Sequence, residues 1–282
     1  MDNSREQIKF IRLALKEDIG KGDITTRAVA LKGIGRGEVI AKEKGIISGI
    51  GPFRRVFKLL SPSFTLKILK KDGQRVKPGD LVIEIKGPLD LMLIGERTSM
   101  NLLCHLSGVA ASTRQYVDLI KGYRAKILDT RKTMPGMRIW EKAAVKHGGG
   151  DNHRIGLYDM YLVKENHIAA AGGLEKAIKA VIRHKKKTGA RLEVEVKDLA
   201  ELRDALQFNP DFIMLDNFTV PVMKKAVALA RSINSKVLLE ASGNVSLENV
   251  KKIAATGVDR ISIGRITHSA PALDLSFKVR LR

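Results

Sequence analysis

The sequence contains few of the residues that mark secreted, membrane-bound or base-stacking proteins. One cysteine, Cys104, among 282 residues excludes an internal disulfide. No apolar run reaches membrane-spanning length, and residues 1–6 are too polar for a secretion signal. Aromatic residues make up only 5% of the chain, too few for a platform on which bases would stack. These absences predict a cytoplasmic protein with no membrane partner.

Acidic residues are also in the minority. The chain has 51 Lys and Arg against 30 Asp and Glu, a formal net charge of +21, which favours anionic partners. The cations are spread along the chain, and their one run of three, Lys185–Lys187, closes an expected helix, where positive charge is favoured anyway. We therefore expect small anionic substrates and no nucleic-acid partner. A basic nucleic-acid-binding protein is the alternative, which a contiguous basic surface would support.

The first hundred residues predict a small α+β unit. Apolar residues recur at helical spacing over 4–17, and an extended segment is expected to begin at Ile24. A turn containing Pro and Gly at 77–80 joins two expected strands of an antiparallel sheet. A long helical pattern over 89–106 is expected to break or bend at Gly108, before a second helix. Expected strands span 38–43, 46–48, 64–69 and 81–85, and further expected helices span 53–60 and 110–121.

From Lys126 the pattern changes to a regular alternation of strand and helix. Such alternation predicts parallel strands joined by crossover helices. A polar residue recurs at the C-terminal end of every strand, which favours a barrel, because a barrel gathers all of those ends on one face. Six strands are fewer than the usual eight, so the predicted fold is an incomplete six-stranded α/β barrel. Expected strands span 126–130, 160–164, 191–196, 212–217, 236–242 and 260–265, and expected helices span 138–147, 168–187, 198–207, 219–231 and 246–255.

Cations follow the first two strands of this series. Arg131 and Lys132 follow the first, Lys164 ends the second, and the loop after a run of three glycines carries His153 and Arg154. Such cations repel one another, so gathering them is costly unless an anion joins them. The pattern therefore predicts an anion site at the barrel mouth. The alternative is a set of separate, solvated charges.

Carboxylates and glycine loops follow the later strands. Glu195 and Asp216 end the third and fourth strands, either as site residues or as salt-bridge partners of the cations. Glu193 shares a face with Glu195 and lies deeper along the strand. Glycine loops follow the last two strands, where barrels commonly bind phosphate through backbone amides; plain turns are the alternative. The histidines fit no zinc spacing, and Cys104, Met137 and Trp140 are expected in the core or an interface.

Three motifs in the barrel half resemble the signature of the quinolinate phosphoribosyltransferase family. They are Thr130–Thr133, Gly148–Arg154 and Lys164–His167, and the resemblance extends to Glu17–Gly20, Gly22–Thr26 and Thr267–Ser269. It implies that phosphoribosyl passes from phosphoribosyl pyrophosphate to quinolinate with decarboxylation, giving nicotinate mononucleotide, pyrophosphate and CO2 in NAD biosynthesis. A relative with the same fold but another acceptor, such as nicotinate, is the alternative.

The resemblance also implies a domain organisation. An N-terminal α+β sandwich domain would span 1–108, the open barrel 109–270, and a C-terminal segment, 271–282, would return to the first domain. The enzyme would be a homodimer with shared active sites, or a higher oligomer, in which Arg97 reaches into the neighbouring subunit's site.

Roles for the site residues follow from the same resemblance. Arg131, Arg154 and Lys164 would bind the dicarboxylate, for which the planar arginine fork is suited. Lys132 would lie between the dicarboxylate and the pyrophosphate. His153 would hold the pyridine ring or orient Arg154, with a structural role in the glycine loop as the alternative.

The phosphoribosyl half of the site would use the later strand ends. Glu195 and Asp216, with Lys132, are the catalytic candidates, because carboxylates accept hydrogen bonds from ribose hydroxyls and stabilise positive charge on the sugar. Mg2+ is expected with the phosphorylated substrate, and no direct metal ligand is assigned. Many relatives have a small residue in place of Arg265, so its side chain has no assigned role. The further substrate-binding candidates are Thr130, Ser242, Gly243, Asn244, Ile263, Gly264 and Arg265.

Overall fold

The computed structural model describes residues 3–29 and 32–280, so the last two residues of the expected C-terminal segment lie outside the described residues. The chain divides into two compact units. The first consists of the described parts of residues 1–112, 135–149 and 270–282, and the second of residues 113–134 and 150–269. The segment 135–149, which the sequence placed in the barrel, thus belongs to the first unit. Across the described ranges, no helix is long and apolar enough to cross a membrane.

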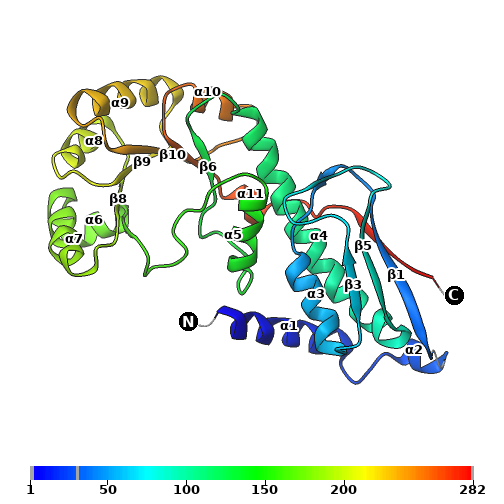
Figure 1. The fold of residues 1–282 in the computed structure, drawn as a ribbon. Helices are drawn as coiled ribbons and strands as arrows, with labels where there is room; N and C mark the ends of the chain where they lie inside the picture. Colours follow the sequence, from blue (N-terminus) through cyan, green and yellow to red (C-terminus); the bar gives the residue numbers. More distant parts are fainter. Residues whose placement is uncertain (1–2, 30–31, 281–282) are drawn as a thin grey trace. The chain divides into compact units, whose positions relative to one another are not determined.

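The first unit is built on an antiparallel four-stranded sheet with the strand order β12-β1-β5-β3 (Figure 1). The strand from the C-terminal segment pairs with β1 along its length, from Ala41 opposite Leu275 to Arg36 opposite Arg280. The strands of the unit are β1 (Ile34–Ala41), β2 (Gly45–Ile46), β3 (Thr65–Ile68), β4 (Arg75–Val76), β5 (Leu81–Pro88) and β12 (Leu275–Arg280). The helices are α1 (Asn3–Ile19), α2 (Ile24–Ala28), α3 (Ile50–Leu60), α5 (Arg138–His147) and most of α4 (Leu89–Leu119).

Aromatic packing holds helix α3 against this sheet. Phe57 of α3 is fully buried, with its ring centroid 5.1 Å from that of Phe64 and 6.3 Å from that of Phe277 on β12. Glycines at Gly35 and Gly37 leave room on β1 for the side chains of neighbouring elements. The result is a small helix-on-sheet sandwich, as the sequence predicts.

Two local predictions in this unit are wrong. Gly108 does not break the helix, because α4 runs continuously from Leu89 to Leu119. A Cβ at Gly108 would lie 2.0 Å from the carbonyl oxygen of Pro271, so this glycine admits the returning C-terminal segment. Residues from Ile24 form helix α2 rather than an extended segment, because the Asp23 carboxylate caps the helix by accepting two backbone N–H groups at 2.9 and 3.0 Å.

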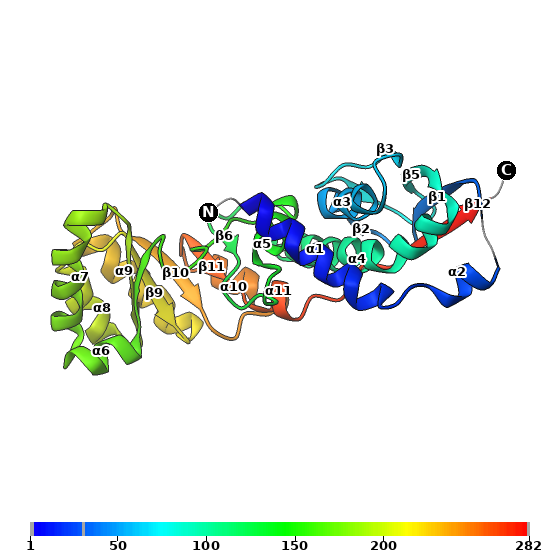
Figure 2. The same cartoon turned by 90° about the horizontal axis from the view of Figure 1, so that it is seen from below.

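The second unit is a six-stranded parallel sheet with the order β6-β11-β10-β9-β8-β7, and helices α6 to α9 run along the outside of it (Figures 1 and 2). Its strands are β6 (Lys126–Leu128), β7 (Tyr161–Val163), β8 (Leu192–Val196), β9 (Phe212–Asp216), β10 (Leu238–Ser242) and β11 (Arg260–Ser262). Its helices are α6 (Glu165–Ala171), α7 (Leu174–Thr188), α8 (Leu199–Leu206), α9 (Val220–Ile233), α10 (Val250–Ala254) and α11 (Arg265–His268), besides the end of α4.

The strand order confirms the incomplete barrel. The last strand pairs back with the first, β11 with β6, but no pairing between β6 and β7 is found among the described residues. The chain after the glycine run lies in this seam instead. The backbone N–H of Asp151 donates to the carbonyl oxygen of Ile127 at 2.7 Å. The backbone N–H of Asp129 donates to the carbonyl oxygen of Asp151 at 3.3 Å. The open seam therefore positions the segment that carries His153 and Arg154.

Two further details of the barrel differ from the sequence-based expectation. One helix was expected over 168–187, but Gly172, with a φ of 75°, ends α6 in the left-handed conformation, and α7 starts after Gly173. The last strand ends at Ser262 rather than at 265, because the chain turns there into the short helix α11.

Candidate active site

The C-terminal ends of four barrel strands surround a pocket of about 720 Å3. This volume lies within the range of about 300–1,000 Å3 typical of small-molecule sites. The pocket gathers nine of the candidate residues, namely Thr130, Lys132, Asp216, Ser242, Gly243, Asn244, Ile263, Gly264 and Arg265. They come from β6, β9, β10 and β11 or the loops that follow, so residues at these strand ends come together at one pocket.

A network of hydrogen bonds connects Asp216 to the loop after β10. Asn217 Nδ2 donates to Asp216 Oδ2 at 2.9 Å, and Asn217 Oδ1 accepts from Asn244 Nδ2 at 3.3 Å. The backbone N–H of Asn217 donates to Ser242 O at 2.9 Å. Asn217, Gly243 and Asn244 all have positive φ, of 55°, 92° and 49°. Backbone strain of this kind gathers at functional sites, where the surrounding structure holds it in place.

Lys132 lies against the loop after β11. The Thr267 hydroxyl donates to Lys132 O at 2.8 Å and ties the end of β6 to helix α11. A Cβ at Gly264 would lie 3.1 Å from Lys132 Cδ, which shows how closely the lysine stem follows the glycine backbone. The Lys132 stem therefore borders the glycine loop at the edge of the pocket.

Arg154 is buried although it carries a full charge. Its side chain donates from Nη1 to Met160 O at 3.1 Å, and the residue is 8% exposed. Burial, and then the charge of Arg131, lower the pKa of Arg154 from its ordinary value. Asp159 fixes the loop that follows by accepting the backbone N–H groups of Ile155 and Gly156. The barrel thus brings cations together at an energetic cost, and a bound anion would offset that cost.

Glu195 stands between a cation and a second carboxylate. Its Oε2 lies 4.0 Å from Lys164 Nζ. Burial raises the pKa of Glu195, Lys164 lowers it and Asp216 raises it again. Lys164 itself begins helix α6, and its backbone N–H donates to His167 Nδ1 at 3.1 Å. Lys164, Glu195 and Asp216 therefore form a row at the ends of neighbouring strands, one cation followed by two carboxylates.

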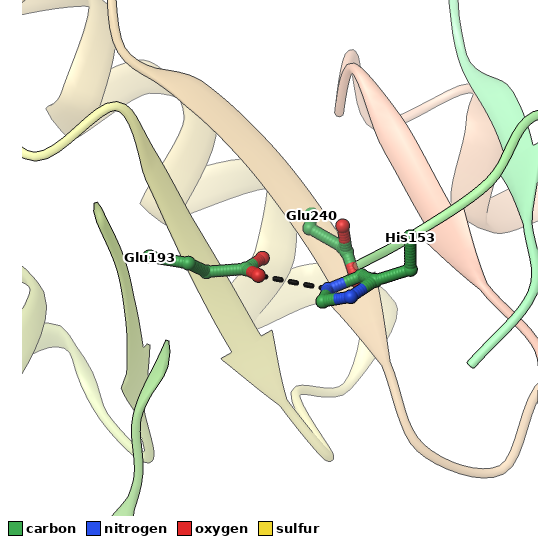
Figure 3. Close-up of side chains that lie close together, drawn as sticks. All are labelled: His153, Glu193 and Glu240. Carbon is green, nitrogen blue, oxygen red and sulfur yellow. Dashed lines mark ion pairs between the residues drawn. The ribbon is translucent and has the colours of Figure 1, made fainter. Parts of the chain in front are cut away.

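The His153 side chain points into the barrel, so its contacts are not limited to the glycine loop. Figure 3 shows its ring beside the carboxyl groups of Glu193 on β8 and Glu240 on β10. Nε2 of the ring lies 2.8 Å from Glu193 Oε2 and 3.4 Å from Glu240 Oε1. The backbone N–H of His153 donates to Asp129 Oδ1 at 2.9 Å. Both glutamates are 0% exposed.

The family is settled by models that match nearly the whole chain. The model described as quinolinate phosphoribosyl transferase, C-terminal domain, matches residues 109–278, and the model of the N-terminal domain matches residues 23–107. The chain belongs to the quinolinate phosphoribosyltransferase family.

Individual relatives agree with the family assignment. The chain is 43% identical over 265 residues to a probable nicotinate-nucleotide pyrophosphorylase [carboxylating] from Synechocystis sp., covering 94% of this chain and 90% of that protein. It is 40% identical to a quinolinate phosphoribosyltransferase [decarboxylating] 2a from Nicotiana tabacum, with coverage of 95% and 81%. The structure of the nicotinate-nucleotide pyrophosphorylase from Francisella tularensis is similar with a TM-score of 0.93 at 41% identity, covering 99% of this chain and 98% of that one.

Six of the candidate residues do not line the pocket. Arg131, His153, Arg154, Lys164 and Glu195 lie elsewhere in the barrel unit, and Arg97 belongs to the first unit. Arg97 is on helix α4, with its Nη2 3.9 Å from Glu96 Oε1. The contacts of these six residues with substrate stay a prediction.

Asn217 and Glu240 were not predicted from the sequence, and Glu193 was left without a role. Asn217 follows Asp216 directly, and an Asn after a strand is a residue that tolerates positive φ, which was an available signal. Glu240 interrupts the apolar strand Leu238–Ala241, and a charged residue inside such a strand was the signal for it. Glu193 was noted as lying deeper in the barrel, and its complete burial confirms that placement.

Proposed function

We propose that this protein transfers phosphoribosyl from phosphoribosyl pyrophosphate to quinolinate and releases CO2, forming nicotinate mononucleotide for NAD biosynthesis. The observation that carries the proposal is the match of both family domains across residues 23–107 and 109–278. The pocket supports it, because its glycine loops and Lys132 suit an anionic sugar phosphate.

The reaction joins two polyanions, and the residues divide between them. Arg131, Arg154 and Lys164 bind the pyridine dicarboxylate, and arginine can do so with two parallel hydrogen bonds. Ser242 to Asn244 and Ile263 to Arg265 hold the ribose phosphate through backbone amides. Thr130 and Lys132 lie between the two halves of the site, where the leaving pyrophosphate is expected.

The chemistry proceeds by nitrogen attack and loss of carbon dioxide. The ring nitrogen forms a bond to C1 of the ribose while the bond from C1 to pyrophosphate breaks. Glu195 and Asp216 accept hydrogen bonds from the ribose hydroxyls and stabilise the positive charge that develops on the sugar. The bond from C2 of the ring to its carboxyl group then breaks, CO2 leaves, and the electron pair on C2 takes up a proton.

Mg2+ fits this site as a companion of the pyrophosphate. Asp216 lines the pocket and offers the carboxylate oxygen that Mg2+ prefers, while Mg2+ commonly takes its other ligands from substrate phosphates and water. When bound, the ion would neutralise charge on the leaving group. We include in the proposal a homodimer with shared sites, in which Arg97 from one subunit binds the dicarboxylate at the other.

The experiment that tests this function is a comparison of acceptors. The protein is incubated with phosphoribosyl pyrophosphate, Mg2+ and either quinolinate or nicotinate, and nicotinate mononucleotide is measured. We expect product from quinolinate, and little or none from nicotinate, because three cations are gathered for two carboxylates. Efficient turnover of nicotinate with none of quinolinate would assign the protein to the other acceptor class.

A further inference from the structure

The two buried glutamates that flank His153 have no part in the chemistry above. One ligand atom from each of His153, Glu193 and Glu240 lies within 4.8 Å of the others, which is a spacing that a metal ion could use. All three residues are buried, inside the barrel and beside the segment that carries Arg154. Isolated buried charges are costly, so the cluster must be balanced by an ion, by protons or by neighbouring cations.

The hydrogen bonds of the His153 ring argue against a metal. Its Nδ1 accepts the backbone N–H of Arg154 at 2.8 Å, so Nδ1 carries no proton. The proton of the neutral ring is then on Nε2, which is the nitrogen that faces the two carboxyl groups. A metal would need the lone pair of Nε2, and the ring directs an N–H group there instead.

The carboxyl groups are close together and poorly supplied with donors. Among the described residues, none of the four oxygens of Glu193 and Glu240 has a well-aligned hydrogen-bond partner, and His153 Nε2 meets Glu193 at 2.8 Å as an ion-pair contact rather than an aligned hydrogen bond. Arg260 Nε lies 3.3 Å from Glu240 Oε2, and the Ser262 hydroxyl, which donates to Ala241 O at 3.5 Å, also lowers the pKa of Glu240. Two buried carboxylates cannot both stay ionised at such short range without strong repulsion. One proton held between them removes the repulsion and leaves a single charge opposite Arg260.

We propose that Glu193 and Glu240 share one proton, and that this singly charged pair is a positioning device that holds the His153 ring and, through it, the Arg154 segment for binding the acceptor. The inference rests on the proposed function, because Arg154 is there a ligand of quinolinate. His153 is anchored at two points, by the carboxyl pair at its ring and by Asp129 at its backbone. The ring in turn accepts the N–H of Arg154, so a shift of the ring would move that residue.

The surroundings of the pair support a shared proton. Burial raises the pKa of Glu193 to about 7, with Arg260 and Arg154 opposing the rise and Glu195 adding to it. Burial raises the pKa of Glu240 to about 7 as well, with repulsion from Glu193 as the next cause, opposed by His153 and Arg260. A hydrogen bond with Glu240 also lowers the pKa of Glu193, and His153 and Arg260 lie against the two members, so the single charge belongs to the pair rather than to one glutamate.

The first test measures stability against pH and does not depend on catalysis. The folded protein binds more protons than the unfolded chain between about pH 4.5 and pH 7, so stability falls as the pH rises through that window. Glu193→Gln replaces one carboxyl group of the pair by a neutral amide and so removes the repulsion. We therefore expect the Tm of this variant, relative to wild type, to rise between pH 5.5 and pH 8. Glu84→Gln, at a partly exposed strand position of the first unit, is the matched control. Its Tm difference from wild type should not change with pH.

The second test separates positioning from folding through the two Michaelis constants. Glu193→Gln should keep the KM for quinolinate within about threefold of wild type, because the amide can still accept from His153 and donate to Glu240. Glu193→Gln/Glu240→Gln leaves Arg260 without its anion. It should raise the KM for quinolinate by about tenfold or more, as removal of a buried charged partner does, with the KM for phosphoribosyl pyrophosphate nearly unchanged. Glu193→Ala should resemble the double variant rather than the single one.

Three results would contradict the proposal. A Glu193→Gln protein that fails to fold, or that has a flat Tm difference, would show that Glu193 is needed as an anion. Equal rises in both KM values would indicate a general structural role. A stoichiometric metal in purified wild type that is lost in Glu193→Gln would assign the cluster to metal binding. Absence of any product from wild-type protein would overturn the proposed function instead, and the stability test would still decide whether the proton is shared.

Discussion

A side chain at Gly243 would collide with Asn217, because a Cβ there would lie 2.0 Å from Asn217 Oδ1 and 2.6 Å from its Cγ. Gly243 also has a φ of 92°, a conformation that costs other residues about 1–2 kcal/mol. The loop after β10 thus depends on glycine both for its backbone and for the close approach of Asn217. This loop is the part of the pocket to which we assign the ribose phosphate.

Gly243→Ala is expected to weaken the binding of phosphoribosyl pyrophosphate far more than the binding of quinolinate. The clash displaces the amides that would bind the phosphate, so the KM for phosphoribosyl pyrophosphate should rise by about tenfold or more, the loss expected for one or two weakened hydrogen bonds to a charged group. Gly51→Ala is the control, since a Cβ at Gly51 meets nothing within 4 Å. Steady-state kinetics with each substrate varied in turn measures the effect. If both KM values rise alike, the loop supports the whole barrel mouth.

Asn217→Ala should lower the kcat/KM for phosphoribosyl pyrophosphate by about tenfold, the effect of losing two side-chain hydrogen bonds around Asp216. Asn209→Ala is a closely matched control. Asn209 also has positive φ and also bonds another asparagine, Asn234, but it precedes β9, whereas Asn217 follows it. Equal losses in the two variants would mean that Asn217 matters for stability rather than for the site.

Arg131→Ala and Lys164→Ala are each expected to abolish most turnover while the fold is kept. Removal of one charged contact costs roughly 2–4 kcal/mol of transition-state binding, or about ten- to a thousand-fold in rate. Arg191→Ala removes a cation that precedes β8 and stacks on Phe212, and it should leave turnover nearly unchanged. Near-normal quinolinate kinetics in either of the first two variants would remove that residue from the site.

Subunit mixing tests whether Arg97 acts at a neighbouring site. In a mixed dimer of inactive Arg97→Ala and inactive Lys164→Ala, a shared arrangement places both defects in one site and leaves the other intact. Random exchange should therefore restore about a quarter of wild-type activity, because half of the dimers are mixed and each has one good site. If exchange is demonstrated but activity does not return, Arg97 serves its own subunit's site or none.

The fold was largely readable from the sequence because strand-end polarity and helix periodicity are local patterns. The positions that failed depend on distant contacts. Gly108 resembles a helix break, yet it serves the approach of Pro271, more than 160 residues further along the chain. The segment 135–149 belongs to the first unit although it lies between two barrel strands, and no local pattern announces this.

The site was predictable at its edges and less so in its interior. Residues at a strand end, such as Asp216, or just after one, such as Gly243, could be placed by counting strands. Glu193 and Glu240 could not be paired, because the sequence shows neither which strands are neighbours nor which faces meet inside the barrel. For Asn217 the sequence offered only the tolerance of asparagine for positive φ, because its contact with Asn244 depends on the next loop.

The measurement that tests the central claim most directly follows the lost carboxyl group. The protein is given phosphoribosyl pyrophosphate, Mg2+ and quinolinate labelled in the carboxyl group at C2, and labelled CO2, pyrophosphate and nicotinate mononucleotide are measured in the same reaction. We expect the three products in equal amounts, with no label in the nucleotide. A nucleotide that retains the label, or CO2 released without pyrophosphate, would contradict the account.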